Sequence, residues 1–343
     1  MDTVLFLAHT DSGALPRATL EALTAAKELA AALGAKLDLA VLGEGASGVA
    51  GALAGAGGSR VLVAEGPDLA QPRYATDASA ATALAKASGA GIVVAPHTSR
   101  LARVMAGVAV RLSGRIDTHV TGLDGAGGGA AATRWFYRQR IEGKIRRKER
   151  PWILLVDPGT ARAHEASGAA PAVEPVPVTV AEVEKRTRIE GTRQPGTGKS
   201  TIRPDAALLF VAGAGWTKKQ ADGKPHPEDA EQLILSFLDS SGASLGSSKS
   251  LVDQAGEGQK IFEFMSHMNQ VGQTGATPRH PKGLATCCHG EEPHVVGWRF
   301  IGQRRAVNLD PNCGWARGKA DVLYVADAFA VMAKVNALLA RKK

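Results

Sequence analysis

Short apolar runs alternate with stretches of helical periodicity through the first part of the chain. Residues 4–8, 37–42 and 60–64 are nearly continuous apolar runs, as expected of parallel strands buried on both faces. Residues 17–33 instead carry apolar side chains at helical spacing, and Gly34 can end that helix. This alternation predicts a parallel α/β sheet.

The same alternation continues to about residue 156. It predicts helices over 77–88 and 99–112, the second capped by Ser99, with a buried strand over 91–95 between them. After a glycine-rich stretch, segments 133–139 and 152–156 are typical of late, partly antiparallel strands that complete the sheet. The first domain is therefore predicted to be doubly wound and Rossmann-like.

A linker and a second α/β domain follow. Prolines near residue 175 and then charged, glycine-rich residues up to Pro204 indicate the linker. The alternation then restarts, with strands expected at 206–211, 305–308 and 322–325, a turn at 213–215, and helices at 228–238 and 328–339. We predict an α/β protein of two doubly wound, mostly parallel-sheet domains: an N-terminal domain over 1–187, a linker over 188–204 and a C-terminal domain over 205–343.

The charge of the chain adds little to the predicted fold and domain organisation. Lys and Arg number 41 against 33 Asp and Glu, for a net charge of +8. The densest basic run, residues 138–150, is interrupted by Glu142 and Glu149 and has no interleaved aromatic side chains for base stacking. We interpret it as a solvated ribbon or a partner-facing edge, and expect no nucleic-acid partner.

The cysteine content and the amino-terminal sequence indicate the cellular compartment of the protein. Three cysteines, at 287, 288 and 313, are too few and odd in number for a secreted disulfide scaffold. The chain enters a strand-like run at once, without a signal or transit pattern, and no apolar run has membrane-spanning length. A cytoplasmic protein without a membrane span is expected.

Two local patterns suggest other chemistry. G-T-G-K-S at 196–200 resembles the end of a phosphate-binding P-loop, but Arg193 stands where the leading glycine belongs and Pro204 interrupts the following helix, so we interpret the segment as linker. A Cys/His-rich region offers a metal or thiol-redox site as an alternative to buried, inert thiols. Its members are His280, Cys287, Cys288, His289, His294 and Cys313.

Five ordered blocks resemble a known family. They read A-P-H-T-S-R at 95–100, G-A-S-L-G-S-S-K-S-L-V-D at 242–253, V-G-Q-T-G at 271–275, H-G-E-E-P-H at 289–294 and A-V-N-L-D-P at 306–311, followed by Ala-Asp pairs at 320–321 and 326–327. Their order and spacing are similar to those of electron transfer flavoprotein alpha subunits, whose flavin domain carries G-A-x-x-G-A-S-R-x-x-V-D, V-G-Q-T-G, S-G-A-I-Q-H and A-I-N-x-D-P. The resemblance covers nearly the whole chain.

The resemblance implies that residues 205–343 bind FAD. Glycines let the backbone approach a pyrophosphate, a cation such as Lys249 or His294 would stabilise negative charge on the reduced flavin ring, and Asn308 and Asp321 at strand ends would bind the ribose or adenine. The implied cofactor-binding residues are Ser248, Lys249, Val271, Gly272, Gln273, Thr274, His289, Gly290, Glu291, Glu292, Pro293, His294, Asn308 and Asp321.

Several positions depart from the family pattern. Lys249 replaces an arginine and keeps the charge without the planar fork, and a second family arginine corresponds to Gly215 or Trp216. His289 replaces a serine, and two carboxylates follow close behind it. We therefore expect FAD to bind with an altered potential or accessibility.

By resemblance, the chain is an electron carrier rather than a substrate-converting enzyme, and it requires no catalytic acid, base or nucleophile. It would accept electrons on FAD from a dehydrogenase and pass them to a quinone oxidoreductase or other respiratory acceptor. A beta subunit would form a heterodimer with it and hold AMP. The alternatives are a flavin-less scaffold or nucleotide-binding subunit of a redox complex, and a Cys/His metal or thiol-redox protein.

Overall fold

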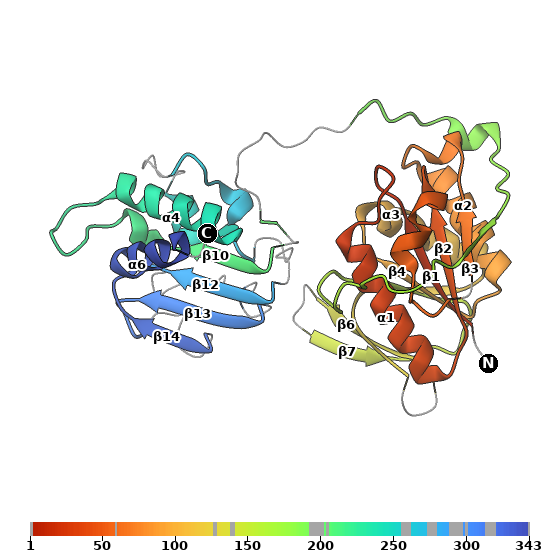
Figure 1. The fold of residues 1–343 in the computed structure, drawn as a ribbon, viewed down its shortest axis with the longest axis horizontal. Helices are drawn as coiled ribbons and strands as arrows, with labels where there is room; N and C mark the ends of the chain where they lie inside the picture. The colour runs from red at the N-terminus through yellow and green to blue at the C-terminus, as the bar shows by residue number, and fades with distance from the viewer. Residues whose placement is uncertain are drawn as a thin grey trace. The chain divides into compact units, whose positions relative to one another are not determined.

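The computed structural model describes eleven stretches of the chain, which fall into two compact units, residues 1–192 and 193–343. Figure 1 shows the elements of each unit. The described residues are 3–58, 60–125, 129–137, 141–191, 202–203, 206–254, 262–272, 280–287, 298, 301–312 and 320–341.

The first unit is built on a nine-stranded sheet with the order β7-β6-β5-β8-β4-β1-β2-β3-β9. Neighbouring strands pair in parallel except at β5–β6 and β6–β7, which are antiparallel. The strands are β1 (Val4–His9), β2 (Leu37–Leu42), β3 (Arg60–Ala64), β4 (Ile92–Pro96), β5 (Arg115–Asp124), β6 (Ala131–Phe136), β7 (Ile141–Ile145), β8 (Trp152–Val156) and β9 (Ala172–Pro175).

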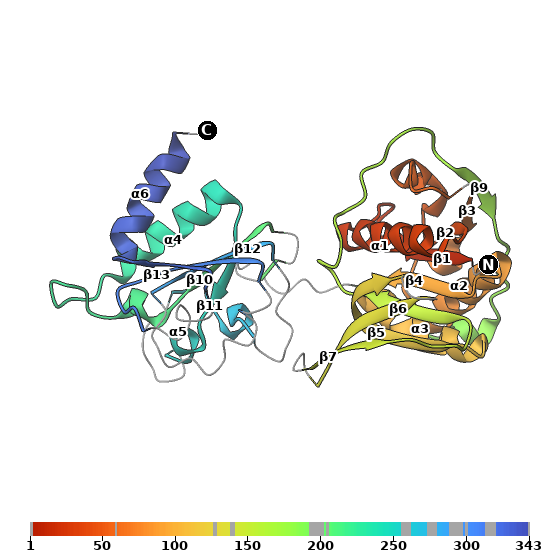
Figure 2. The same cartoon turned by 90° about the horizontal axis from the view of Figure 1, so that it is seen from below.

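Helices cover both faces of this sheet, as Figure 2 shows. Because side chains alternate along β1, Val4 and Phe6 pack with helix α1 (Arg17–Leu33) on one face. Leu5 and Leu7 pack on the other face with α2 (Tyr74–Ser88) and α3 (Ser99–Arg111). The predicted doubly wound fold of this unit is confirmed. Short 3₁₀ helices lie at η1 (Ala46–Leu53), η2 (Pro67–Leu69) and η3 (Glu182–Lys185).

Two helix starts differ from the sequence prediction. The cap of α3 is Thr98, whose hydroxyl accepts a hydrogen bond from the Leu101 N–H at 3.3 Å, and Ser99 is already the first helical residue. Helix α2 begins at Tyr74, three residues before the predicted start, because the backbone leaves its extended conformation after Arg73. The predicted end of α1 is confirmed, since Gly34 adopts a left-handed conformation with φ 60°.

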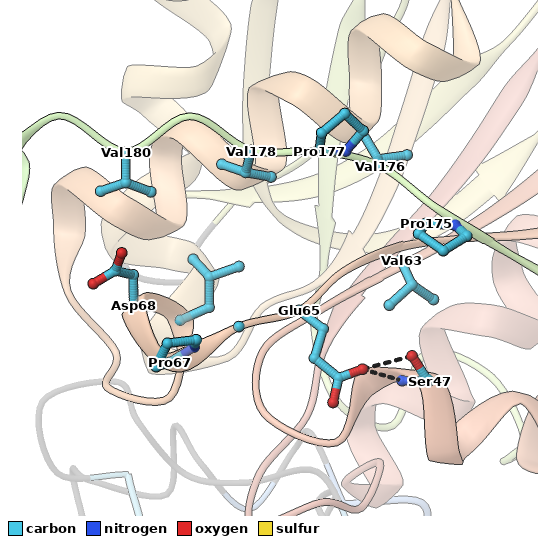
Figure 3. A pocket seen from close by; sticks show the side chains of 12 residues that line it. Ser47, Val63, Glu65, Pro67, Asp68, Pro175, Val176, Pro177, Val178 and Val180 are labelled. Atoms are coloured by element: carbon cyan, nitrogen blue, oxygen red, sulfur yellow. Dashed lines mark hydrogen bonds between the residues drawn. The ribbon is translucent and has the colours of Figure 1, made fainter.

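Part of the proline-rich segment that was predicted to be linker forms a strand. β9 pairs in parallel with β3, which extends the sheet beyond the predicted end of its alternation. The chain after β9 then passes η2 and lines a cavity of about 400 Å³ (Figure 3). On the opposite wall, Glu65 accepts hydrogen bonds from the main-chain N–H and the hydroxyl of Ser47. Further along, the Ile189 N–H donates to the Gln71 side chain of this unit at 3.3 Å.

One buried carboxylate joins the antiparallel hairpin to the parallel part of the sheet. Asp117 in β5 accepts hydrogen bonds from Arg134 of β6 at 2.9 Å, from Trp152 of β8 at 2.9 Å, and from both ends of the Arg147 guanidinium. Burial alone would raise the pKa of Asp117, but these hydrogen bonds outweigh it and hold the pKa below its ordinary value. Part of the basic run between 138 and 150 is thus neutralised inside the fold.

The second unit contains a five-stranded, wholly parallel sheet of order β11-β10-β12-β13-β14. Phe210 and Ala212 of β10 pack with α4 and α6 on one face, while Leu209 and Val211 pack with Trp298 on the other. The predicted class, two α/β units with mainly parallel sheets, is confirmed. The elements are β10 (Leu208–Ala212), η4 (Ala214–Thr217), α4 (Pro227–Ser241), β11 (Ser244–Ser247), α5 (Lys249–Asp253), η5 (His267–Asn269), β12 (Lys282–Thr286), β13 (Gln303–Asn308), β14 (Val322–Val325) and α6 (Ala328–Ala340).

Among the described residues, no helix has both the length and the apolar character that a membrane crossing requires.

Replacing Asp117 by Asn should destabilise the first unit by roughly 2 kcal/mol or more, because two arginines and an indole N–H lose their charged acceptor. Urea unfolding followed by circular dichroism measures the change. The difference between wild type and variant should shrink as the pH falls below about 4, since a carboxylate with a lowered folded pKa stabilises the fold only while it is ionised.

Glu149→Gln is the matched control, because Glu149 faces Arg115 at 3.9 Å in an exposed pair of the same region. We expect its unfolding midpoint to equal that of the wild type. Equal midpoints for the Asp117 variant and the wild type would contradict the role assigned to this carboxylate.

Candidate functional site

The parallel sheet of the second unit brings the ends of five strands to one edge. Because all of its strands run in the same direction, the residues that follow them meet at the carboxyl edge. These residues are Gly213 after β10, Ser248 after β11, Cys287 after β12, Asn308 at the end of β13 and Asp327 after β14. In strand orders of this type a ligand binds at the carboxyl edge, commonly beside the switch point, which here lies between β10 and β12.

Protein side chains fill the switch point itself. Trp216 is fully buried, and its indole N–H donates to the hydroxyl of Thr286 at 2.9 Å. A Cβ atom on Gly215 would lie 2.7 Å from the Cys287 carbonyl oxygen, so only glycine fits there. Trp216, one of the two positions that correspond to the family's second arginine, therefore acts as a core residue and offers no cation at this edge.

The Cys287 thiol is also part of this packing. Burial, with a smaller contribution from the charge of Asp327, raises its pKa to about 12, so the protonated form dominates at neutral pH. His280 precedes β12 and Cys287 follows it, so the two lie at opposite edges of the sheet, and the His280 ring contacts the Arg203 carbonyl at 2.8 Å. These two cannot ligate one metal ion. Cys288, His289, His294 and Cys313 lie outside the described residues.

The turn after β11 has the small residues and the polar atoms that a ligand site needs. The Ser248 hydroxyl accepts a hydrogen bond from the Leu251 N–H at 3.2 Å and caps α5. Ser247 is fully buried, and among the described residues its hydroxyl has no hydrogen-bond partner. An unsatisfied buried hydroxyl is costly, and this one is available to a further hydrogen-bond partner.

The V-G-Q-T-G block begins beside this turn. The Val271 N–H donates to the Ser247 carbonyl at 3.0 Å, and Gly272 takes φ 81°, a conformation that favours glycine. A Cβ atom on Gly246 would lie 2.8 Å from the Val271 side chain, so glycine at 246 lets the two segments approach. The structure therefore brings four predicted site residues together: Ser248, Lys249, Val271 and Gly272.

Lys249 carries a positive charge, which an acidic side chain partly neutralises. Its ammonium forms an ion pair with Asp253 one turn later in α5. The His267 ring contacts the other oxygen of the same carboxylate at 3.1 Å. The hydrogen bond from Lys249 is the main reason that the pKa of Asp253 is lowered. The Lys249 side chain is 41% exposed, and its ammonium group is directed along α5 to Asp253.

Asn308 and Asp321 do not lie at the same edge. Asn308 ends β13 at the carboxyl edge and is buried, and its side-chain oxygen accepts a hydrogen bond from the Asp310 N–H at 3.2 Å. Asp321 precedes β14 at the amino edge, where its carboxylate binds the main chain and guanidinium of Arg304. Asp327, in the second Ala-Asp pair, instead lies at the carboxyl edge and caps α6 through the N–H groups of Phe329 and Ala330.

The remaining predicted site residues fall outside the described part of the chain. They follow Gly272 and Cys287 in sequence, and both of those residues are at the carboxyl edge. The residues are Gln273, Thr274, His289, Gly290, Glu291, Glu292, Pro293 and His294.

Comparison with known proteins identifies the family. The electron transfer flavoprotein domain matches residues 3–182, which is more than half of the chain. The chain belongs to the electron transfer flavoprotein family. It is also similar to Protein FixB of Clostridium saccharobutylicum, with 27% identity over 312 residues that span 90% of this chain and 87% of FixB.

These matches confirm that the chain is a divergent, alpha-type electron transfer flavoprotein, with an electron-transfer role of that type. Sequence reasoning nevertheless overlooked Asp327 and Ser247. The strand direction would have distinguished the two Ala-Asp pairs, since only a residue after β14 reaches the carboxyl edge. No sequence signal indicated that the hydroxyl of Ser247, rather than that of Ser248, would be left unpaired.

Cys287 should resist alkylation in the folded protein. With a pKa of about 12 rather than about 8.5, its thiolate fraction at pH 8 falls from about a quarter to about 1 in 10,000. We expect labelling by iodoacetamide at least a hundredfold slower than in urea, as measured by peptide mass spectrometry with fragment ions that separate Cys287 from Cys288. Labelling at the same rate in the folded and unfolded protein would show a reactive thiol.

Proposed function

We propose that this electron transfer flavoprotein chain binds FAD along the carboxyl edge of its second unit and carries electrons between redox partners. The observation that supports the proposal most strongly is that Ser248, Lys249, Val271 and Gly272 lie together beside Ser247, whose buried hydroxyl has no partner among the described residues. Family membership gives the reason to expect a flavin, and the geometry of this turn supports the proposed place.

The described residues fit a dinucleotide. Gly272 has no side chain and takes φ 81°, so a ligand can approach the backbone closely there, while Gly246 lets Val271 pack against the turn. The Ser247 hydroxyl can donate to, or accept from, a polar ligand atom. Lys249 supplies the positive charge that a flavin or a diphosphate favours, and Asn308 and Asp327 supply polar groups further along the same edge.

Bound FAD would supply the capacity to take up and release electrons. The residues of the chain orient it and set the charge around it. Because Lys249 is paired with Asp253, it stabilises negative charge less than an unpaired arginine would, which lowers the expected reduction potential. Because protein side chains fill the switch point, a ligand would lie on the side of β11 and the turn that follows it.

The proposed partners follow from the family. A beta subunit would complete a heterodimer and hold AMP, a dehydrogenase would donate electrons, and a quinone oxidoreductase or other respiratory acceptor would receive them. We place this exchange in the cytoplasm. The first unit carries the sheet on which the family match rests and is the proposed surface for the beta subunit.

Flavin content tests the proposal directly. The chain co-expressed with its beta subunit should purify with stoichiometric FAD and show the absorbance bands of an oxidised flavin. A colourless complex that also takes up no FAD on reconstitution would contradict the proposal and would favour a flavin-less scaffold.

The carboxyl-edge aspartate should matter more than the one at the amino edge. Asp327→Asn keeps a side chain that can cap α6 but removes the charge, and should weaken FAD binding about tenfold, the loss expected for one charged hydrogen bond. Asp321→Asn is the matched control and should leave the Kd unchanged. Fluorescence titration measures both values, and the reverse ranking would show that the nucleotide extends to the other edge.

A further inference from the structure

Two histidines and an aspartate meet at the carboxyl edge of the first unit, in a place that the electron-transfer proposal does not use. They are His97, His119 and Asp157. His97 follows β4, His119 lies in β5 and Asp157 follows β8. These three strands are neighbours, in the order β5-β8-β4.

The register of the sheet explains why these side chains lie close together. Val120 of β5 pairs with Val156 of β8, which pairs with Pro96 of β4. The next residues of β4 and β8 are His97 and Asp157, so their side chains leave the sheet together. Main-chain hydrogen bonds fix both backbones as well. The His97 N–H donates to the Val156 carbonyl, and the Asp157 N–H donates to the Val120 carbonyl, both at 2.8 Å.

His119 reaches the same point through an irregularity in β5. The pairing with β8 shifts between Asp117 and Val120, and His119 takes φ 55°. A left-handed conformation is uncommon for a residue other than glycine, and a bulge of this kind re-aims a side chain. Strained positions of this sort occur often at binding sites.

The three side chains face one another at close range. The Nδ1 atom of His97 lies 2.6 Å from Oδ1 of Asp157, and Nδ1 of His119 lies 3.4 Å from the same oxygen. The two imidazole rings stand edge to face, with centroids 4.4 Å apart. One carboxylate oxygen thus faces two ring nitrogens, and one ligand atom from each residue lies within 4.8 Å of the others.

The charge and the shielding of the cluster suit a cation. The Asp157 carboxylate presents one oxygen to both imidazole rings. Its side chain is 14% exposed and that of His97 is 15% exposed, whereas that of His119 is 57% exposed. The cluster is therefore shielded on one side and accessible to solvent on the His119 side.

We propose that His97, His119 and Asp157 form a binding site for a divalent transition metal ion of the Zn²⁺ type. Two imidazoles and a carboxylate are a common ligand set for such ions, with solvent in the open position. Tetrahedral bonds of about 2.05 Å place ligand atoms about 3.3 Å apart. The His119–Asp157 distance already matches this value, and the His97–Asp157 contact must open by less than 1 Å.

One neighbouring charge opposes the ion. Arg134 acts on His119 as a like charge. Its guanidinium is, however, bound to the Asp117 carboxylate at 2.9 Å, which partly neutralises it. Asp157 acts on the His119 ring more strongly than Arg134 does.

Metal titration of the full-length chain tests the site. After chelator treatment and dialysis, the wild type should bind one Zn²⁺ with a micromolar or lower Kd by calorimetry, and Co²⁺ should give the visible absorption of tetrahedral nitrogen and oxygen ligation. His119→Gln and Asp157→Asn should each weaken binding at least tenfold. His119 is largely exposed, so its variant is expected to fold, which circular dichroism checks.

His226→Gln is the matched control. His226 is a histidine of the second unit that lies 2.8 Å from Asp222 and 3.5 Å from Asp229, and its variant should bind Zn²⁺ like the wild type. A Cys288→Ser variant separates this site from the Cys/His-rich region. The proposal fails if the wild type binds no ion, or if His119→Gln retains full affinity.

Discussion

The common direction of neighbouring strands is the constraint on which both candidate sites depend. In a parallel sheet the residue after each strand must emerge at the same edge, whatever its distance in the chain. In the second unit this places Ser248 and Asn308 at one edge, although 60 residues of sequence separate them. In the first unit it places His97 and Asp157 beside each other. Glycines at Gly215 and Gly246 then let the connecting segments approach closely.

The antiparallel hairpin of the first unit shows how the chain completes such a sheet. Asp117 lies in the interior beside β6 and β8, and its carboxylate accepts from two arginines and an indole. A buried carboxylate is tolerated because its charge is compensated at every oxygen. Two residues later the irregularity in β5 turns His119 toward Asp157. The anchoring of the hairpin and the metal-site geometry thus share one short segment.

Much of the fold was predictable because buried parallel strands and amphipathic helices leave strong patterns. The apolar run at 4–8 and the glycine at 34 predicted β1 and the end of α1. β5 and β9 were missed because their polar and proline-containing sequences carry no buried pattern. They form strands through pairing with β8 and β3, which is a tertiary effect.

The candidate site was predictable to a smaller extent. Family-like blocks indicated the turn around Lys249 and the start of the V-G-Q-T-G block, and the structure brings these together. They did not distinguish Asp321 from Asp327, because that choice depends on which edge of the sheet each aspartate reaches. Nor did the letters around Trp216 show that its side chain would fill the switch point. Such packing depends on contacts between residues distant in sequence.

We propose that FAD lies along the carboxyl edge on the side of β11. Peptide-resolved hydrogen–deuterium exchange, with and without FAD, tests it most directly. Bound FAD should slow exchange in residues 246–253 and 270–272, with no change around β1 to β3 of the first unit. Slower exchange confined to the first unit, or none in the turn after β11, would contradict it.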